Sequence, residues 1–335
     1  MSVHLLARRD VAPLSAVSRP HSIGSSCIGH KISLLCSTIA GCRLLRWGGT
    51  ELPVEWTIRE VLNWTRGYLE DAGIIQPRLE AEILLAHALD VERLHLYISP
   101  DKPLTTDERT RYRMVIQKRK SGIPLQHLVG EVSFFGLRFK VRREALIPRP
   151  ETEELLERAL KLAPRDREVR CIDLGTGAGV IAICLARYLP RADVSAVDVS
   201  PDALRLAEEN ARVNGVEDRV CFLRSDWLAD VEGRFDLIVS NPPYVATEDL
   251  EELSPEVRDH EPRVAIDGGA GGLKRIESLV GGALDHMVAG GALLLEIGIG
   301  QAEKVCGLLE EAGLNDVAVE RDVAGVERFV VARCP

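Results

Sequence analysis

The sequence lacks three features that would assign it to a well-defined class of protein. None of its eight cysteines forms a C-x-x-C pair, so neither a zinc site nor a redox pair is predicted, and we expect reduced, buried cysteines. No apolar run reaches the roughly 18 residues that a membrane-spanning helix needs. Positive charge is not in excess: the net charge of −9 argues against a broad surface for nucleic acid.

The length of 335 residues predicts about two domains of roughly 100–200 residues each. Residues 1–53 differ from the remainder. They hold six Lys and Arg against two Asp and Glu, so they carry +4 and leave −13 for the rest of the chain. An Arg- and Ser-rich, acid-poor segment is typical of an organellar transit peptide. The other interpretation, which we favour, is a start site assigned too far upstream. In both cases we expect residues 1–53 to be a disordered extension outside the fold.

Residues 54–130 predict a small helical domain. Thr57 and Glu60 form a capping box, and an apolar stripe follows them as far as Gly73. Pro77 stands where proline favours the first turn of a second helix. This domain offers no catalytic constellation. Two further helices are expected at about 91–97 and 106–120.

Residues 131–146 predict a β-hairpin linker, because aromatic and β-branched residues alternate on either side of Gly136. The motif at 147–153 follows and opens a helix that continues to about Leu162. It has two interpretations. One is a capped helix start. The other places Arg149 and Glu153 on the rim of a ligand site.

Residues 147–335 predict an α/β fold: a doubly wound, seven-stranded, Rossmann-like domain. Strands and helices alternate, which calls for a sheet with helices on both faces. Ligands in such sheets lie outside the carboxyl ends of the strands. Strands are expected at 169–173, 193–197, 220–223, 235–239, 292–297, 316–319 and 329–332, and helices at 179–188, 201–213, 272–288 and 301–311.

A glycine-rich loop follows the first predicted strand of the sheet. Its glycines allow a tight turn and a close approach of backbone to ligand at a helix N-terminus. Val180 stands where a dinucleotide fingerprint has its third glycine, which disfavours a nicotinamide oxidoreductase. The loop instead suits the amino-acid end of a nucleoside ligand. It comprises Gly175, Thr176, Gly177, Ala178 and Gly179, after Asp173.

Two further motifs end the next strands. Asp198 lies 19 residues beyond Gly179, where a carboxylate accepts hydrogen bonds from two ribose hydroxyls. In Ser225-Asp226-Trp227, the aspartate suits an exocyclic amine, and Trp227 offers a face for a purine. A turn aspartate and a packing tryptophan are the structural alternatives.

The fourth motif is Asn241-Pro242-Pro243-Tyr244. Two prolines fix their own φ angles and cannot donate backbone hydrogen bonds, so they make a stiff elbow after the strand. One amide, free carbonyls and one aromatic ring suit a planar, NH2-bearing group. The order of all four motifs fits S-adenosylmethionine, with its methyl group directed at Asn241. No metal is expected.

With these motifs, the chain resembles the HemK-type family of protein methyltransferases over about residues 54–335. The resemblance rests on residues 147–153, 173–179, 225–227 and 240–244, with Glu261-Pro262 and Gly268-Gly269. It implies methyl transfer from S-adenosylmethionine to the glutamine side-chain amide in the Gly-Gly-Gln loop of peptide chain release factors. It implies cofactor contacts at the glycine loop, Asp198, Trp227 and Asn241, and substrate contacts at Asn241, Pro242, Pro243 and Tyr244, of which Asn241, Pro242 and Tyr244 are the expected catalytic residues.

The elbow alone does not distinguish an amide from an adenine. The alternative is therefore a DNA or RNA adenine N6-methyltransferase that acts on a flipped base. The acidic charge and the helical domain, expected to grip the release factor, argue against it. We expect a monomeric cytoplasmic enzyme without stable nucleic-acid binding, or an organellar one if residues 1–53 are a transit peptide.

Overall fold

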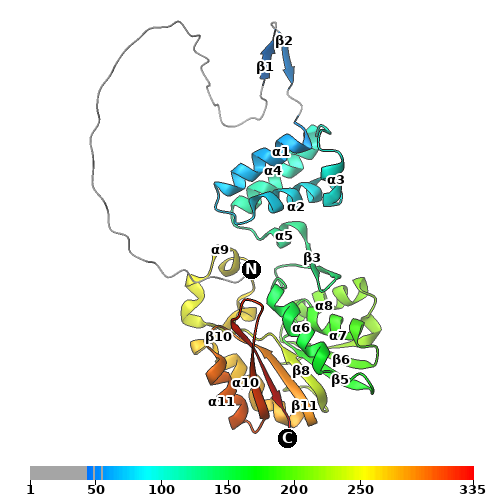
Figure 1. Cartoon of the computed structure of the whole chain (residues 1–335), viewed down its shortest axis with the longest axis vertical. Coiled ribbons are helices and arrows are strands. Elements are labelled where there is room, and N and C mark those ends of the chain that lie inside the picture. The colour runs from blue at the N-terminus through cyan, green and yellow to red at the C-terminus, as the bar shows by residue number, and fades with distance from the viewer. Residues whose placement is uncertain (1–43, 48–49, 54–55) are drawn as a thin grey trace, which may run out of the picture. The chain divides into compact units, whose positions relative to one another are not determined.

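The computed structural model describes residues 44–47, 50–53 and 56–335 (Figure 1). Residues 1–56 and Thr57–Pro335 are separate units. Most of the predicted extension lies outside the described residues. Two short strands occur in it where no regular element is predicted: β1 (Leu44–Trp47) and β2 (Thr50–Pro53) pair antiparallel.

The second unit begins with the helices predicted for residues 54–130. The Thr57 side chain accepts from the Glu60 N–H, and the Glu60 carboxylate accepts from the Thr57 N–H, so the capping box is confirmed. The helices α1 (Ile58–Glu70), α2 (Pro77–Leu89), α3 (Arg93–Ile98) and α4 (Thr106–Lys120) follow the prediction within a few residues. A short α5 (Leu125–Val129) was not predicted.

The predicted hairpin is present as β3 (Glu131–Phe134) and β4 (Leu137–Lys140). Asn210 holds it in place, since its side-chain oxygen accepts from the Lys140 N–H at 2.7 Å. The helix α6 (Pro150–Leu162) then runs over the predicted residues, with proline at its first position.

A seven-stranded sheet forms the centre of residues 169–335, and the predicted fold class is confirmed. Its strand order is β12-β13-β11-β8-β5-β6-β7. β13 is antiparallel to both of its neighbours, and the other pairs are parallel. The strands are β5 (Val169–Leu174), β6 (Ala192–Asp198), β7 (Val220–Arg224), β8 (Phe235–Ser240), β11 (Met287–Glu296), β12 (Asn315–Arg321) and β13 (Glu327–Arg333).

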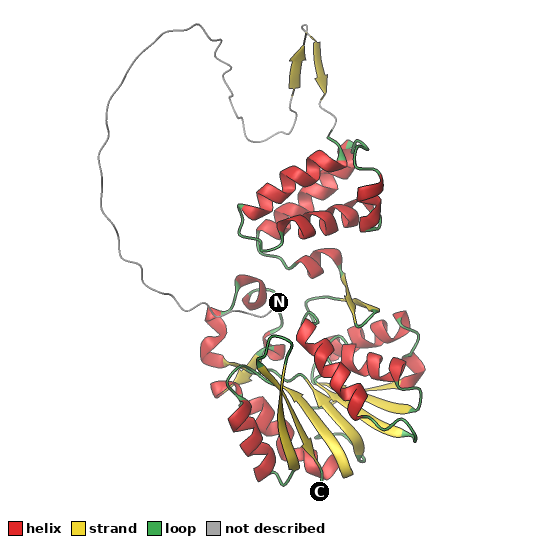
Figure 2. Ribbon diagram, viewed as in Figure 1, coloured by secondary structure: helices red, strands yellow, loops and turns green. Residues whose placement is uncertain are grey.

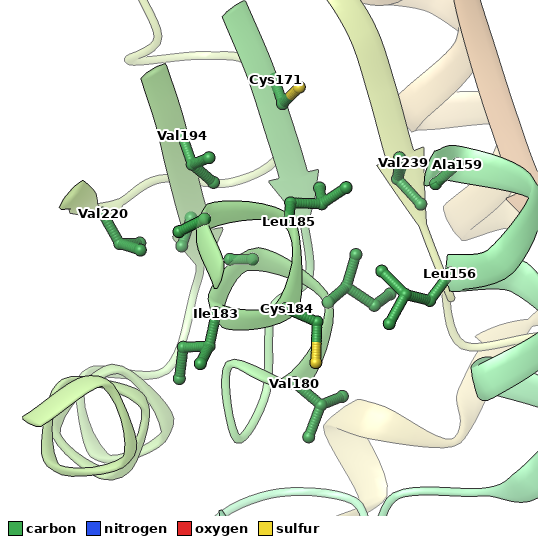
Figure 3. Close-up of a cluster of buried hydrophobic side chains, with 14 of the residues drawn as sticks. Leu156, Ala159, Cys171, Val180, Ile183, Cys184, Leu185, Val194, Val220 and Val239 are labelled. Carbon is green, nitrogen blue, oxygen red and sulfur yellow. The ribbon is translucent and has the colours of Figure 1, made fainter. Parts of the chain in front are cut away.

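Helices cover both faces of this sheet, each over its own apolar core (Figure 2). Alternation along the strands divides their side chains between the cores: Cys171 enters one and Ile172 the other. Figure 3 shows part of the first core, to which Leu156, Cys184 and Val239 contribute side chains. It is covered by α6, α7 (Val180–Tyr188) and α8 (Pro201–Val213), and the second by α10 (Lys274–Ala283) and α11 (Ala302–Glu311).

The helix predicted for residues 272–288 is too long at both ends. α10 ends at Ala283, a 3-10 turn follows, and β11 begins at Met287, which is fully buried and pairs with Phe235. The predicted helix was too long because the apolar residues at the start of β11 continue the apolar pattern of α10. The segment between β8 and α10 also forms elements that were not predicted: β9 (Val245–Ala246), η2 (Thr247–Glu252), α9 (Pro255–Arg258), η3 (Arg263–Ala265) and β10 (Asp267–Gly269).

Candidate active site

A cleft of about 1000 Å³, including its open mouth, lies at the carboxyl ends of β5, β6, β7 and β8. The structure brings all four predicted motifs to this cleft. Three predicted residues, Gly179, Pro242 and Tyr244, lie outside its lining. The predicted residues that line it are Gly175, Thr176, Gly177, Ala178, Asp198, Trp227, Asn241 and Pro243.

The glycine loop turns sharply between β5 and α7. Gly175, Gly177 and Gly179 have φ angles of 75°, 56° and 84°, a conformation that disfavours side chains. A Cβ on Gly179 would lie 2.9 Å from the Cβ of Ala207 in α8. Gly179 therefore permits close packing of helices, whereas Gly175 and Gly177 expose backbone to the cleft.

Asp198 ends β6 and faces the same cleft. Its carboxylate accepts from the Gly177 N–H at 2.9 Å and from the Ser200 N–H at 2.9 Å. Burial raises the pKa of Asp198, and these N–H donors oppose that rise. A carboxylate has about four lone-pair positions, so acceptor capacity remains for ligand hydroxyls.

Asp173 lies beneath the glycine loop and is fully buried. One carboxylate oxygen accepts from the Thr176 hydroxyl at 2.6 Å and from the Ala182 N–H at 3.2 Å. Among the described residues, none donates to the other oxygen. Burial raises the pKa of Asp173 to about 7. Because Asp173 uses the Thr176 hydroxyl, Thr176 offers the cleft mainly its backbone.

Trp227 lies against the glycine loop at Gly175. A Cβ on Gly175 would lie 3.5 Å from the indole ring of Trp227. The φ of Trp227 is 54°, an unusual value for a bulky residue and one that often marks a functional site. The neighbouring Ser225 has a structural part, since its hydroxyl accepts from the Asp230 N–H at 2.9 Å.

The elbow after β8 is anchored on both sides of Asn241. The Ser240 hydroxyl donates to the Leu174 carbonyl of β5 at 2.6 Å. The Asn241 side-chain NH2 donates to the Thr152 hydroxyl of α6 at 2.9 Å. Among the described residues, no donor is bonded to the Asn241 side-chain oxygen or to the Pro242 carbonyl. Both oxygens therefore lack a donor, and of these two residues Asn241 is the one that lines the cleft.

Tyr244 turns away from the cleft lining and toward the end of β11. Its hydroxyl lies 3.4 Å from Glu296, and burial raises the pKa of this tyrosine. The Gln301 side chain donates to the Tyr244 carbonyl at 2.9 Å. Gly268 passes so close that a Cβ there would lie 2.8 Å from the Pro243 carbonyl. The quoted Gly268-Gly269 pair therefore packs against the elbow from outside.

Two family models match the chain: the PrmC N-terminal domain at residues 60–130 and the Methyltransferase small domain at residues 152–255. A release factor glutamine methyltransferase of Geobacter sulfurreducens is 45% identical over 285 residues, which cover 85% of this chain and 99% of that protein. The chain belongs to the release factor glutamine methyltransferase family. A relative of the same name from Koribacter versatilis is 41% identical, covering 83% of this chain and 99% of its own. A solved methyltransferase from Pyrococcus furiosus is 19% identical, with a TM-score of 0.46 over 60% of this chain and 90% of its own.

In this release factor glutamine methyltransferase, the motif at 147–153 fits the ligand-rim interpretation only in part. Arg149 lines the cleft and donates to Glu261 at 2.6 Å. Glu153 does not line it. Its carboxylate accepts from the Phe135 N–H of the hairpin at 2.7 Å, so its placement on the rim is wrong.

Sequence reasoning assigned no role to two buried residues behind Asn241, Thr152 and Glu296. Glu296 ends the apolar run of β11, and a carboxylate in such a run is an unusual signal that was available in the sequence. Burial raises the pKa of Glu296 to about 7.

Neither a metal centre nor a membrane span is found in the part of the chain that the structure describes. No three His, Cys, Asp or Glu side chains there are grouped to hold a metal ion. Every helix in the same residues is too short or too polar to cross a membrane.

Proposed function

We propose that this enzyme transfers a methyl group from S-adenosylmethionine to the side-chain nitrogen of the glutamine in the Gly-Gly-Gln loop of peptide chain release factors. Membership of the family supports the reaction and the substrate. The observation that carries the proposal is the state of Asn241. Its NH2 donates a hydrogen bond to Thr152, and no donor among the described residues is bonded to its oxygen. Asn241 lines the same cleft as the glycine loop.

The cleft suits S-adenosylmethionine by its donor and acceptor set. Gly175 and Gly177 leave room for close approach to the backbone, and Asp198 retains acceptors for ribose hydroxyls. Trp227 offers an aromatic face for adenine. When bound, the cofactor supplies an electrophilic methyl group on a sulfonium sulfur.

The elbow acts on the acceptor amide by orientation. The nitrogen of an amide is a weak nucleophile, because its lone pair is delocalised into the carbonyl. The Asn241 side-chain oxygen and the Pro242 carbonyl each accept one N–H of the glutamine amide, which directs its nitrogen toward the methyl group. Tyr244 supports the elbow from outside the cleft, with its hydroxyl 3.4 Å from Glu296. Orientation of this kind supplies roughly 7–11 kcal/mol in favourable cases.

Charge develops on the amide nitrogen as its new bond to carbon forms. The same two acceptors stabilise that charge, because they point at the N–H groups that become more acidic. One N–H proton then leaves to solvent or to a nearby acceptor. The products are the N5-methylated glutamine and the demethylated thioether.

The proposal extends to the protein substrate, the oligomeric state and the location of the enzyme. Residues 54–130 contact the release factor, and the enzyme acts as a cytoplasmic monomer without stable nucleic-acid binding. An organellar location is the alternative if residues 1–53 are a transit peptide. The net charge of −9 supports a protein substrate over a nucleic acid.

The proposal is tested by offering the enzyme several acceptors with S-adenosylmethionine labelled in its methyl group. We expect label in a wild-type release factor and none in the release factor whose Gly-Gly-Gln glutamine is replaced by alanine. Label in a DNA or RNA oligonucleotide, with none in the release factor, would establish the adenine methyltransferase instead.

A further inference from the structure

Three polar side chains from distant segments form a chain of hydrogen bonds behind the elbow. The Asn241 NH2 donates to the Thr152 hydroxyl at 2.9 Å. The Thr152 hydroxyl donates to a Glu296 carboxylate oxygen at 2.9 Å. Thr152 is 4% exposed and Glu296 is 1% exposed, so water does not compete for these bonds.

The chemistry of the groups fixes the direction of this chain. Above the raised pKa of about 7, the Glu296 carboxylate is ionised and only accepts hydrogen bonds, so the Thr152 hydroxyl donates its single proton to Glu296. The Thr152 oxygen is then left as an acceptor. Of the two ends of the Asn241 amide, only the NH2 can donate a hydrogen bond to the Thr152 oxygen. The side-chain oxygen of Asn241 must therefore face away from Thr152.

Glu296 also reaches the second polar residue of the elbow. Its other carboxylate oxygen lies 3.4 Å from the Tyr244 hydroxyl, which is placed to donate to it. Arg328, on the neighbouring strand, favours the charged carboxylate, and Glu151 opposes it. A buried carboxylate is costly, and one that is held between two residues of an active-site motif points to a functional reason for its presence.

We propose that Thr152 and Glu296 are positioning residues that set the orientation of the Asn241 amide, so that its oxygen faces the amide to be methylated. The inference rests on the proposed function for its catalytic consequence. The orientation itself is a property of the free enzyme, and it can be measured without any substrate.

The experiment compares Thr152→Val, which keeps the shape and removes the hydroxyl, with Thr152→Ser, which keeps the hydroxyl. Thr65→Val is the matched control, because Thr65 is a fully buried threonine in α1, remote from the elbow. The first readout is the side-chain amide signal of Asn241 in 15N-labelled enzyme at about pH 8, where Glu296 is ionised, assigned by its loss in Asn241→Asp. The second is the steady-state kinetics of release factor methylation.

We expect Thr152→Val to shift the Asn241 amide signal and to speed its hydrogen exchange with water. kcat should fall about 100-fold, the loss that a misplaced reactive group can cause. The affinity for S-adenosylmethionine should stay within roughly twofold, because the effect lies in orientation and not in cofactor binding. Thr152→Ser should restore most of the rate and the signal, and Thr65→Val should leave the Asn241 signal unchanged.

Glu296→Gln provides a second route to the same result if Thr152→Val does not fold. A glutamine amide can accept from Thr152 or donate to it, so the direction is no longer imposed. We expect two Asn241 amide environments and a kcat reduced by about tenfold. An unchanged Asn241 signal in a folded Thr152→Val or Glu296→Gln enzyme would overturn the inference. If the wild-type enzyme methylates no release factor, the proposed function fails, while the amide signal still tests the orientation.

Discussion

At the scale of single residues, the site depends on polar groups that are removed from water. The Asn241 amide has its NH2 bonded to Thr152, and no donor among the described residues is bonded to its oxygen. The carboxylates of Asp173 and Glu296 are both buried, and burial raises the pKa of each to about 7. Each is stabilised by a threonine hydroxyl from a neighbouring segment. These groups explain why substitutions that barely change volume should have large effects.

Replacing Asn241 with alanine should reduce kcat by about 100-fold or more, the scale of losing one preorganised polar group in an active site. S-adenosylmethionine affinity should change much less, because the glycine loop and Asp198 remain. Steady-state kinetics and calorimetric titration separate the two effects. Asn214→Ala, on the far end of α8, is the matched control. A rate near that of the wild type in Asn241→Ala would remove Asn241 from the mechanism.

Glu296 should make stability fall as pH rises. Between the ordinary value of 4.5 and the raised pKa of about 7, the unfolded chain has lost this proton while the folded chain keeps it. The unfolded state then binds fewer protons, so the free energy of unfolding decreases with pH. Glu296→Gln has no titrating group at this position. Between pH 5 and pH 8 its free energy of unfolding should therefore rise relative to that of the wild type by at most about 3 kcal/mol.

Urea unfolding at pH 5 and pH 8 measures that difference. Glu157→Gln is a useful comparison, because the hydrogen bond from Lys161 lowers the pKa of the exposed Glu157 carboxylate. Its contribution has the opposite sign, since it is present above the ordinary pKa and is lost in acid. A Glu296→Gln difference that is constant with pH would contradict the burial argument.

The sequence predicted those site residues that lie in contiguous motifs at strand ends. Gly175, Asp198, Trp227 and Asn241 each follow a short apolar strand, so topology alone brings them together. The support behind Asn241 was not predicted. It joins side chains 89 and 144 positions apart, and no local pattern encodes such a pairing.

At the scale of elements, Asn210 of α8 joins the hairpin to the glycine loop. Its side chain accepts from the Lys140 N–H at 2.7 Å and donates to the Lys140 carbonyl at 3.1 Å and the Ala178 carbonyl at 2.9 Å. Asn210→Ala leaves buried partners unpaired and should lower the free energy of unfolding by about 3 kcal/mol. Cofactor binding should weaken as well, because Ala178 lies in the loop.

Thermal and urea unfolding, with calorimetric titration of S-adenosylmethionine, check both effects of Asn210→Ala. Asn214→Ala serves again as the control: its NH2 donates to the more exposed Arg138 carbonyl at 2.9 Å. We expect that control to cost about 1 kcal/mol. Equal decreases in the free energy of unfolding of the two variants would show that the hydrogen bond from Asn210 to the glycine loop adds no stability of its own.

Two adjacent glycines before α10 provide a test of how the segment after the elbow is packed. Gly271 and Gly272 have φ angles of 61° and 74°, so alanine is strained at both. A Cβ on Gly271 meets nothing within 4 Å, whereas one on Gly272 collides with the Tyr244 carbonyl and lies 2.6 Å from the Gln301 side-chain nitrogen. Gly271→Ala should therefore cost stability alone, about 1 kcal/mol.

Gly272→Ala should cost stability and should also displace the elbow, with kcat reduced by about tenfold or more. Unfolding curves and methylation rates of the two variants provide the comparison. If Gly272→Ala loses no more activity than Gly271→Ala, packing against the Tyr244 carbonyl does not control the elbow.

Prediction of elements succeeded where local chemistry decides the ends. Thr57 caps its helix, and Pro150 and Pro201 open theirs, so those boundaries followed from the sequence. The segment from β9 to β10 was not predicted. Its strands have two and three residues and pair with each other, so neither has a strand-length apolar pattern of its own.

At the scale of the whole molecule, Thr57–Pro335 forms one compact unit and contains the complete cleft. The alignment with the Geobacter sulfurreducens relative covers 99% of that protein over 285 residues. A chain without residues 1–53 should therefore keep its melting temperature and should methylate at a rate within roughly twofold of the full chain.

Differential scanning calorimetry and methylation kinetics on the full and shortened chains test this expectation. Loss of the thermal transition would show that the first 53 residues stabilise the fold. Loss of methylation alone would show that they take part in binding the substrate.

The atom that receives the methyl group distinguishes this enzyme from an adenine methyltransferase. The direct measurement is tandem mass spectrometry of a release factor after incubation with the enzyme and S-adenosylmethionine, beside a parallel reaction with Asn241→Ala. We predict one added methyl group on the side-chain amide of the Gly-Gly-Gln glutamine, and a much smaller fraction modified by the variant. An unmodified release factor, or a methyl group on another residue, would contradict the account.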